Sequence, residues 1–140
     1  MLLAMAMQLT AWGTAYAGPA FMQTGGRTTQ PVGHYKFCQE LPHECNELSP
    51  RRAPIELTRK LWATIVNVNN AVNTKIKPIT DMEQWGKDEV WSYPNTGVGD
   101  CEDYVLEKRR ELISTGIPVG DLLITVARRP NGDGHAVLTV

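Results

Sequence analysis

The chain has 140 residues with 14 basic and 15 acidic side chains, so its formal net charge is −1 with the histidines neutral. Its 42% hydrophobic and 21% charged residues are typical of one globular domain, which excludes intrinsic disorder and collagen-like repeats. The near-neutral balance also argues against nucleic acid as a partner, because binding to phosphate needs clustered lysines and arginines.

Residues 1–17 have the pattern of a signal peptide. They carry no charge, begin with an apolar run and end in Ala15-Tyr16-Ala17, a small-x-small cleavage pattern. They lack the usual basic residue near the start, and an ordinary N-terminal helix is the alternative. No apolar stretch reaches the ~20 residues that span a bilayer, so no stable membrane insertion is expected. The sequence therefore predicts an exported protein, periplasmic or secreted, with one domain over residues 18–140.

Residues 18–54 are rich in Gly, Pro, Thr and Gln and show no sustained period, which predicts an irregular N-terminal arm. Within it, Cys38 and Cys45 lie close enough along the chain to form a disulfide if the backbone turns between them, and export favours this. The alternative is a zinc site formed by His34, Cys38, His43 and Cys45, although that spacing matches none of the common structural zinc motifs.

A long amphipathic helix is predicted in the middle of the chain. Apolar residues recur at steps of three and four from Leu57 to Ile76, and Pro78 stops the pattern. Asn69 and Asn73 share one face of this helix. They are either solvent-exposed or placed there to hold a loop or an ion near the active site.

The second half is predicted to contain a loop, a helix and a hairpin, in that order. Residues 81–99 have the Gly and Pro content of a loop, in which Trp91 either lines a cleft or covers the core. A helix is predicted over residues 101–115. Residues 122–127 and 135–140 are apolar β-type runs separated by a Gly-rich turn, which predicts a pair of strands.

Cys101 is the first candidate for chemistry, because a disulfide between the other two cysteines leaves it as the free thiol. It falls in the first turn of the predicted helix, where the helix dipole favours a thiolate. A cysteine nucleophile is usually activated by a nearby histidine, and His135 is the best candidate because it begins a strand directly after a flexible turn.

Three carboxylates surround this thiol and oppose its ionisation. Asp100, Glu102 and Asp103 would raise the pKa of Cys101, unless a hard cation such as calcium is bound among them. The alternatives need no ion. Asp100 and Asp103 could form a capping pair at the start of the helix, and Cys101 could be a buried structural thiol.

Two C-terminal motifs carry a resemblance to a known family. They are Gly-Asp-Cys-Glu-Asp-Tyr at 99–104 and Gly-His-Ala-Val-Leu-Thr-Val at 134–140. With these motifs, roughly residues 35–140 resemble the bacterial transglutaminase-like cysteine proteinases. The resemblance implies an α+β fold with a papain-like, transglutaminase-like core, in which helices pack on an antiparallel sheet.

The resemblance also implies roles for individual residues. Cys101 matches the nucleophile and His135 the general base of a Cys-His-Asp triad. Asp100, Glu102 and Asp103 match acidic positions linked to calcium in one branch of the family. That branch includes a periplasmic protease that releases a biofilm adhesin from the cell surface.

One departure from the family concerns the third triad residue. The family places an aspartate on the strand after the histidine strand, and this chain ends at Val140 without one. Such a residue holds the imidazole in the correct tautomer. The expectation is therefore a chain truncated at its C-terminus.

We therefore predict an exported cysteine peptidase that hydrolyses peptide bonds through a thioester on Cys101. Its partner would be a protein or peptide substrate, with a cell-surface adhesin suggested by the resemblance, and Trp91 would form part of the cleft. Two alternatives remain open. The same Cys-His pair could transfer the acyl group to an amine, as transglutaminases do, or the domain could be a non-catalytic, calcium-dependent peptide-binding module.

Overall fold

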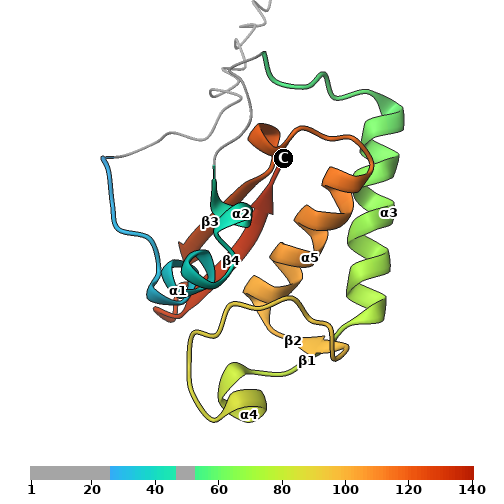
Figure 1. Cartoon of the computed structure of the whole chain (residues 1–140). Helices are drawn as coiled ribbons and strands as arrows, with labels where there is room; N and C mark the ends of the chain where they lie inside the picture. The colour runs from blue at the N-terminus through green and yellow to red at the C-terminus, as the bar shows by residue number, and fades with distance from the viewer. Residues whose placement is uncertain (1–25, 47–52) are drawn as a thin grey trace, which may run out of the picture.

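The computed structural model describes residues 26–46 and 53–140, so the predicted signal peptide lies outside the described residues. The elements follow one another along the chain in the order helices, a first short strand, a helix, a second short strand, a long helix and a hairpin (Figure 1). They are α1 (Val32–Glu40), α2 (Pro42–Cys45), α3 (Arg59–Lys75), β1 (Lys77–Pro78), α4 (Asp81–Trp85), β2 (Val98–Gly99), α5 (Cys101–Ser114), a 3-10 turn (Val119–Asp121), β3 (Leu123–Arg128) and β4 (Gly134–Thr139).

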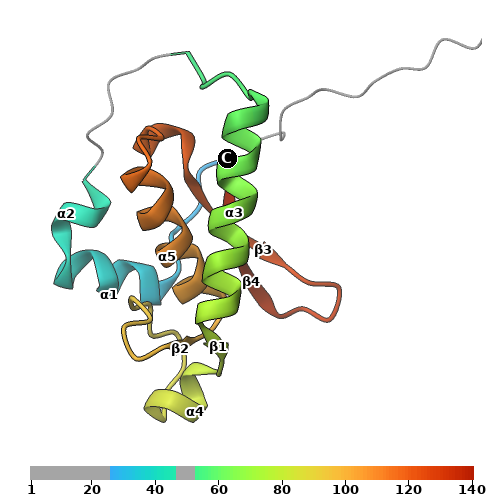
Figure 2. The same cartoon turned by 90° about the vertical axis from the view of Figure 1, so that its right-hand side faces the viewer.

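The described strands form two small sheets. β3 and β4 are antiparallel, with a register that pairs Leu123 with Thr139 and Arg128 with Gly134. β1 and β2 form a short parallel ladder. Helix α5 packs against β4 on one side and against α3 on the other (Figures 1 and 2). Helices therefore pack on an antiparallel sheet, and the predicted α+β fold is confirmed.

The two predicted long helices are present with slightly shorter bounds. Thr58 caps α3 by accepting a hydrogen bond from the Leu61 N–H at 3.1 Å, so the helix begins after Leu57, which is exposed. Lys75 near the end of α3 pairs with the buried Glu107 of α5 at 3.4 Å. This ion pair joins the two helices at the end nearest the β1–β2 ladder.

Two apolar clusters hold the helices and strands together. Phe37 of α1, Trp91 and Leu106 of α5 form the first cluster. The second cluster is built on Leu112, Ile117 and Leu122, against which Leu61, Ile65 and Val68 of α3 pack. Each fully buried apolar side chain contributes about 1.5–3 kcal/mol. The body of α5 thus lies at the centre of the domain and is covered on several sides.

Two segments predicted to be irregular contain helices, and these predictions were wrong. The arm over residues 18–54 includes α1 and α2, because the burial of Phe37 and a disulfide stabilise helices too short to show a clear period. The loop over residues 81–99 begins with α4. Thr80 and Glu83 form a capping box there, which stabilises its first turn. No helix among the described residues is both long and apolar enough to cross a bilayer.

Candidate active site

Cys101 is the first residue of α5, as predicted. Its Sγ donates a hydrogen bond to Glu102 Oε2 at 3.1 Å and accepts one from the Ala136 N–H of β4 at 3.4 Å. Asp100 is the residue before the helix, and its side chain makes no capping hydrogen bond. The alternative in which Asp100 serves as a side-chain cap is therefore not what the structure shows. The thiol lies where the helix N-terminus meets the middle of a strand.

His135 lies on β4 next to Ala136 and shares two cavities with Cys101. One cavity, of about 380 Å³, runs along α5, and the other, of about 520 Å³, lies beside the start of that helix. The ring Nδ1 lies 3.0 Å from Arg129 Nη2, so the guanidinium donates and Nδ1 accepts. Among the described residues, the ring and the thiol do not hydrogen-bond to each other. They share the same cavities without forming a pair.

Three carboxylates gather beside the thiol. One oxygen from each of Asp81, Asp100 and Glu102 lies within 4.8 Å of the others. Asp81 Oδ2 accepts the Val90 N–H at 2.5 Å, whereas Asp81 Oδ1 and Asp100 Oδ1 are buried without a hydrogen-bond partner. Burial and the neighbouring Glu102 raise the pKa of Asp100 to about 7, and burial also raises the pKa of Asp81. The group concentrates negative charge that nothing in the described chain neutralises.

Asp103 lies outside this group, although the sequence placed it among the candidate ligands. It is fully buried, and its Oδ1 accepts the Ser92 N–H at 2.8 Å. A Cβ on Gly99 would come within 2.6 Å of Asp103 Oδ2, so only glycine fits there. Burial raises the pKa of Asp103 to about 7, and the hydrogen bond from Ser92 opposes that shift. Asp103 fastens the segment that carries Trp91 to α5.

The thiol of Cys101 is neutral at physiological pH in this metal-free environment. Burial is the largest cause that raises its pKa to about 11, and the charges of Glu102 and Asp100 add to it. The hydrogen bond from Ala136 acts in the opposite direction. Activation of the thiol therefore requires a change in its electrostatic surroundings.

The comparison with protein families agrees with this arrangement. The family model described as bacterial transglutaminase-like cysteine proteinase matches residues 24–140, a stretch that includes both Cys101 and His135. The chain belongs to this family. No curated protein matches the chain. A cysteine proteinase family implies a protein substrate, and the free thiol of Cys101 is the nucleophile that such chemistry needs.

Trp91 both covers the core and lines the site. Its side chain is only 6% exposed, it packs on Phe37 and Leu106, and it also borders the 520 Å³ cavity beside Cys101. The His34 ring contacts it edge-on at a centroid distance of 4.9 Å. Both interpretations of this tryptophan are therefore met in this member of the proteinase family.

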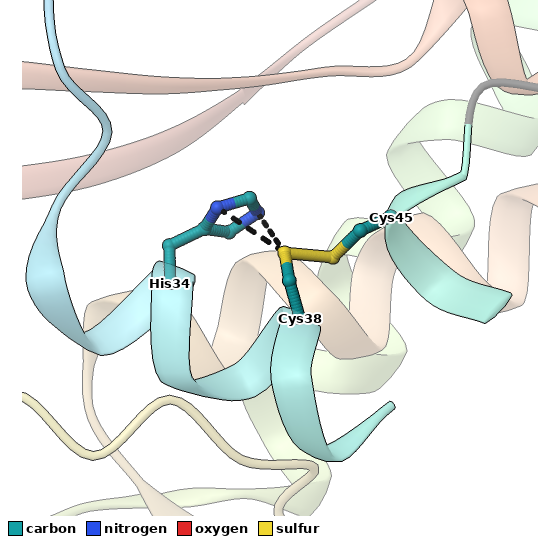
Figure 3. Close-up of side chains that lie close together, drawn as sticks. All are labelled: His34, Cys38 and Cys45. Atoms are coloured by element: carbon teal, nitrogen blue, oxygen red, sulfur yellow. Dashed lines mark hydrogen bonds between the residues drawn. A yellow bond between two sulfur atoms is a disulfide. The ribbon is translucent and has the colours of Figure 1, made fainter. Parts of the chain in front are cut away.

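The predicted disulfide between Cys38 and Cys45 is confirmed, and it excludes the predicted zinc site (Figure 3). His34 lies beside it, with its ring nitrogens 3.6 and 3.8 Å from Cys38 Sγ. His43 lies apart, 3.5 Å from Glu44. The two sulfurs bond to each other and cannot serve as thiolate ligands. The disulfide instead holds α2 against α1, which carries the Phe37 side chain into the core.

Sequence reasoning missed two residues of the site. Asp81 was quoted only within the family resemblance, yet it completes the carboxylate group that Asp103 was expected to complete. Arg129, which contacts His135, was read only as part of a short basic run. The capping pattern at Thr80 marks a helix start at Asp81, and this was the available signal. Asn69 lines the 380 Å³ cavity, whereas Asn73 is exposed.

Proposed function

We propose that this protein is a cysteine peptidase in which Cys101 is the nucleophile and His135 the general base. The observation that supports it most directly is the position of the thiol. Cys101 begins α5, receives the Ala136 N–H and opens onto two cavities that His135 also lines. Nucleophile and base on facing elements at the edge of a cleft are the arrangement that acyl transfer requires.

The reaction follows from these positions. The imidazole of His135 takes the thiol proton, and Sγ attacks the carbonyl carbon of the substrate. The C–N bond breaks, the amine leaves with the proton from the imidazolium, and a thioester on Cys101 remains. Water then hydrolyses it with His135 as base. For this, the His135 ring must exchange its contact with Arg129 for one with the thiol. The Cys101 N–H, at the helix start, would stabilise the oxyanion.

Calcium belongs to the proposal, and Asp81, Asp100 and Glu102 are the residues that would hold it. Calcium prefers carboxylate oxygens, and this group has three within reach of one another, two of them with a buried oxygen that lacks a partner. A bound cation would offset the negative charge that raises the pKa of Cys101. Asp103 supports the site by positioning and is not among these ligands.

We also propose that the protein is exported and that it cleaves a protein at the cell surface, such as an adhesin. The signal-peptide pattern of residues 1–17 and the disulfide between Cys38 and Cys45 support export to the periplasm or beyond.

Proteolysis of a labelled general substrate such as casein tests the catalytic pair. Cys101→Ser and His135→Asn are expected to abolish cleavage, whereas His43→Asn, in which an exposed ring is changed, is expected to leave it intact. Cleavage that persists in Cys101→Ser would refute the proposal.

Calorimetric titration with calcium tests the metal site. Asp81→Asn is expected to remove the binding that the wild type shows, whereas the exposed Glu40→Gln retains it. Equal binding in Asp81→Asn and wild type, or no binding in the wild type, would refute this set of ligands.

A calcium-dependent peptide-binding module without catalysis is the second candidate. The absence of a hydrogen bond between Cys101 and His135 among the described residues, together with the high pKa of the thiol, favours it. Calcium-dependent binding of peptides with no hydrolysis by the wild type would identify this function.

A further inference from the structure

The 380 Å³ cavity is an apolar groove that begins at the thiol. Helix α5 forms its floor, and α3 and β4 form its two walls (Figures 1 and 2). Its apolar lining includes Ile65, Val68, Val105, Leu112 and Leu138. Its volume lies within the range of about 300–1,000 Å³ found for ligand pockets. An apolar lining that is continuous with Cys101 points to a part of the substrate close to the bond that is cut.

The way in which β4 lines the groove shows where the groove lies. Side chains alternate between the two faces of a strand, yet the consecutive residues 135–138 all border the groove and no residue of β3 does. The groove therefore runs beside the edge of β4 that faces away from β3. Among the described strands, no partner pairs with that edge. An unpaired strand edge offers hydrogen bonds to an extended peptide.

Charge divides the surroundings of Cys101 into two halves. The cavity at the start of α5 is lined by acidic side chains, among them Asp88 and Glu89 in addition to the carboxylate group. The groove has no acidic side chain in its lining, and its one charged lining residue other than the histidine is Lys108. Lys108 is half-buried and lies over the Tyr104 ring, and no carboxylate of the described chain pairs with it. A substrate carboxylate would supply the missing partner.

From these features we infer that the groove is the substrate subsite, and that it binds an extended segment with large apolar side chains and an acidic residue that pairs with Lys108. The segment lies along the free edge of β4 and enters the groove between α3 and β4. Its backbone leads directly to Cys101, where the bond next to the segment is cut. This inference rests on the proposed peptidase function and adds the class of sequence that is recognised.

Peptide binding to the Cys101→Ser protein tests the subsite without depending on turnover. Fluorescent peptides carry either a Leu-Ile-Val segment followed by Glu, the same segment followed by Lys, or a Ser segment followed by Glu. The apolar peptide with Glu is expected to bind about tenfold or more tightly than the Ser peptide, since each buried apolar side chain contributes about 1.5–3 kcal/mol. N-methylation of its backbone is expected to weaken binding, because it removes the hydrogen bonds to β4.

Two pairs of variants locate the binding. Val68→Phe fills the groove and is expected to weaken binding of the apolar peptide, whereas Ala63→Phe, on an exposed part of α3, is not. Lys108→Gln is expected to abolish the preference for Glu over Lys, while the exposed Lys60→Gln keeps it. Circular dichroism and thermal melting confirm that each variant is folded.

The outcomes separate this inference from the proposed function. Equal binding of the apolar and Ser peptides, or binding that Val68→Phe leaves unchanged, would overturn the subsite even if casein is cleaved. Selective binding without cleavage would retain the subsite and overturn the peptidase. Concentration-dependent dimerisation that Val68→Phe abolishes would assign the groove to a second copy of the chain and would also overturn the inference.

Discussion

Gly99 is the position where a single methyl group should do the most damage to the site. It lies at the end of β2, and its carbonyl accepts the Ile79 N–H at 3.0 Å. In Gly99→Ala, the new Cβ would lie 2.6 Å from Asp103 Oδ2 and 2.7 Å from Asp103 Cβ. Real side chains do not tolerate such distances, so either β2 or Asp103 must move.

The size of the effect follows from what holds Asp103 in place. Overpacking a buried position costs about 1–3 kcal/mol. If Asp103 is displaced, its hydrogen bond from the Ser92 N–H is lost, and such bonds to charged groups contribute about 1.5–3 kcal/mol. Together we expect Gly99→Ala to lower the free energy of unfolding by about 3–5 kcal/mol. This is a large share of the stability of a domain of this size.

Urea denaturation followed by circular dichroism measures this loss. Gly134→Ala is the matched control, because a Cβ there has no atom within 4 Å, and we expect a change of no more than about 0.5 kcal/mol. Asp103→Gly removes every atom that the new Cβ would meet, so Gly99→Ala in that background should cost under about 1 kcal/mol. An equal cost in both backgrounds, or no difference between Gly99→Ala and Gly134→Ala, would refute the reasoning.

Three further predictions concern the support around the site. Replacing both Cys38 and Cys45 by Ser should lower the free energy of unfolding by roughly 2 kcal/mol, since the disulfide closes a loop with a sequence separation of 7; urea denaturation checks this, and chemical reduction of the wild type should reproduce it. Burial and Arg109 lower the pKa of His34 from 6.5, so the folded state binds a proton more weakly than the unfolded state and loses stability as the pH falls through 6.5. The difference in unfolding free energy between wild type and His34→Gln should therefore shift in favour of the variant between about pH 7.5 and about pH 5, and a difference independent of pH would contradict this. Leu106→Ala should lower the midpoint of thermal unfolding through a loss of about 2–5 kcal/mol, whereas a loss below 1 kcal/mol would show that its cluster is not a true core.

The parts of the fold that sequence could predict are those with a long local signal. The apolar period before Pro78 predicted α3, and the two β-type runs around the Gly-rich turn predicted β3 and β4. The motif around Cys101 placed the nucleophile at the start of α5. Each of these signals lies within one element, where neighbours along the chain determine the structure.

The carboxylate group could not be predicted in full, because it depends on a contact between distant segments. Hydrogen bonds from Lys77 to Gly97 and from Ile79 to Gly99, both 3.0 Å long, bring the segment before α4 alongside the segment before α5. Only this short ladder places Asp81 next to Asp100. No local period marks a two-residue strand, and the sequence therefore offered the adjacent Asp103 in its place.

The register of the β3–β4 hairpin determines which of its residues meets the thiol. Pairing of Ala127 with His135 and of Val126 with Ala136 directs the Ala136 N–H to Cys101 Sγ and leaves His135 at the mouth of the same cavities. A shift of one residue would exchange the two faces of β4. One amino acid inserted into the turn before Gly134 could therefore silence the protein genetically while every residue of its site remained encoded.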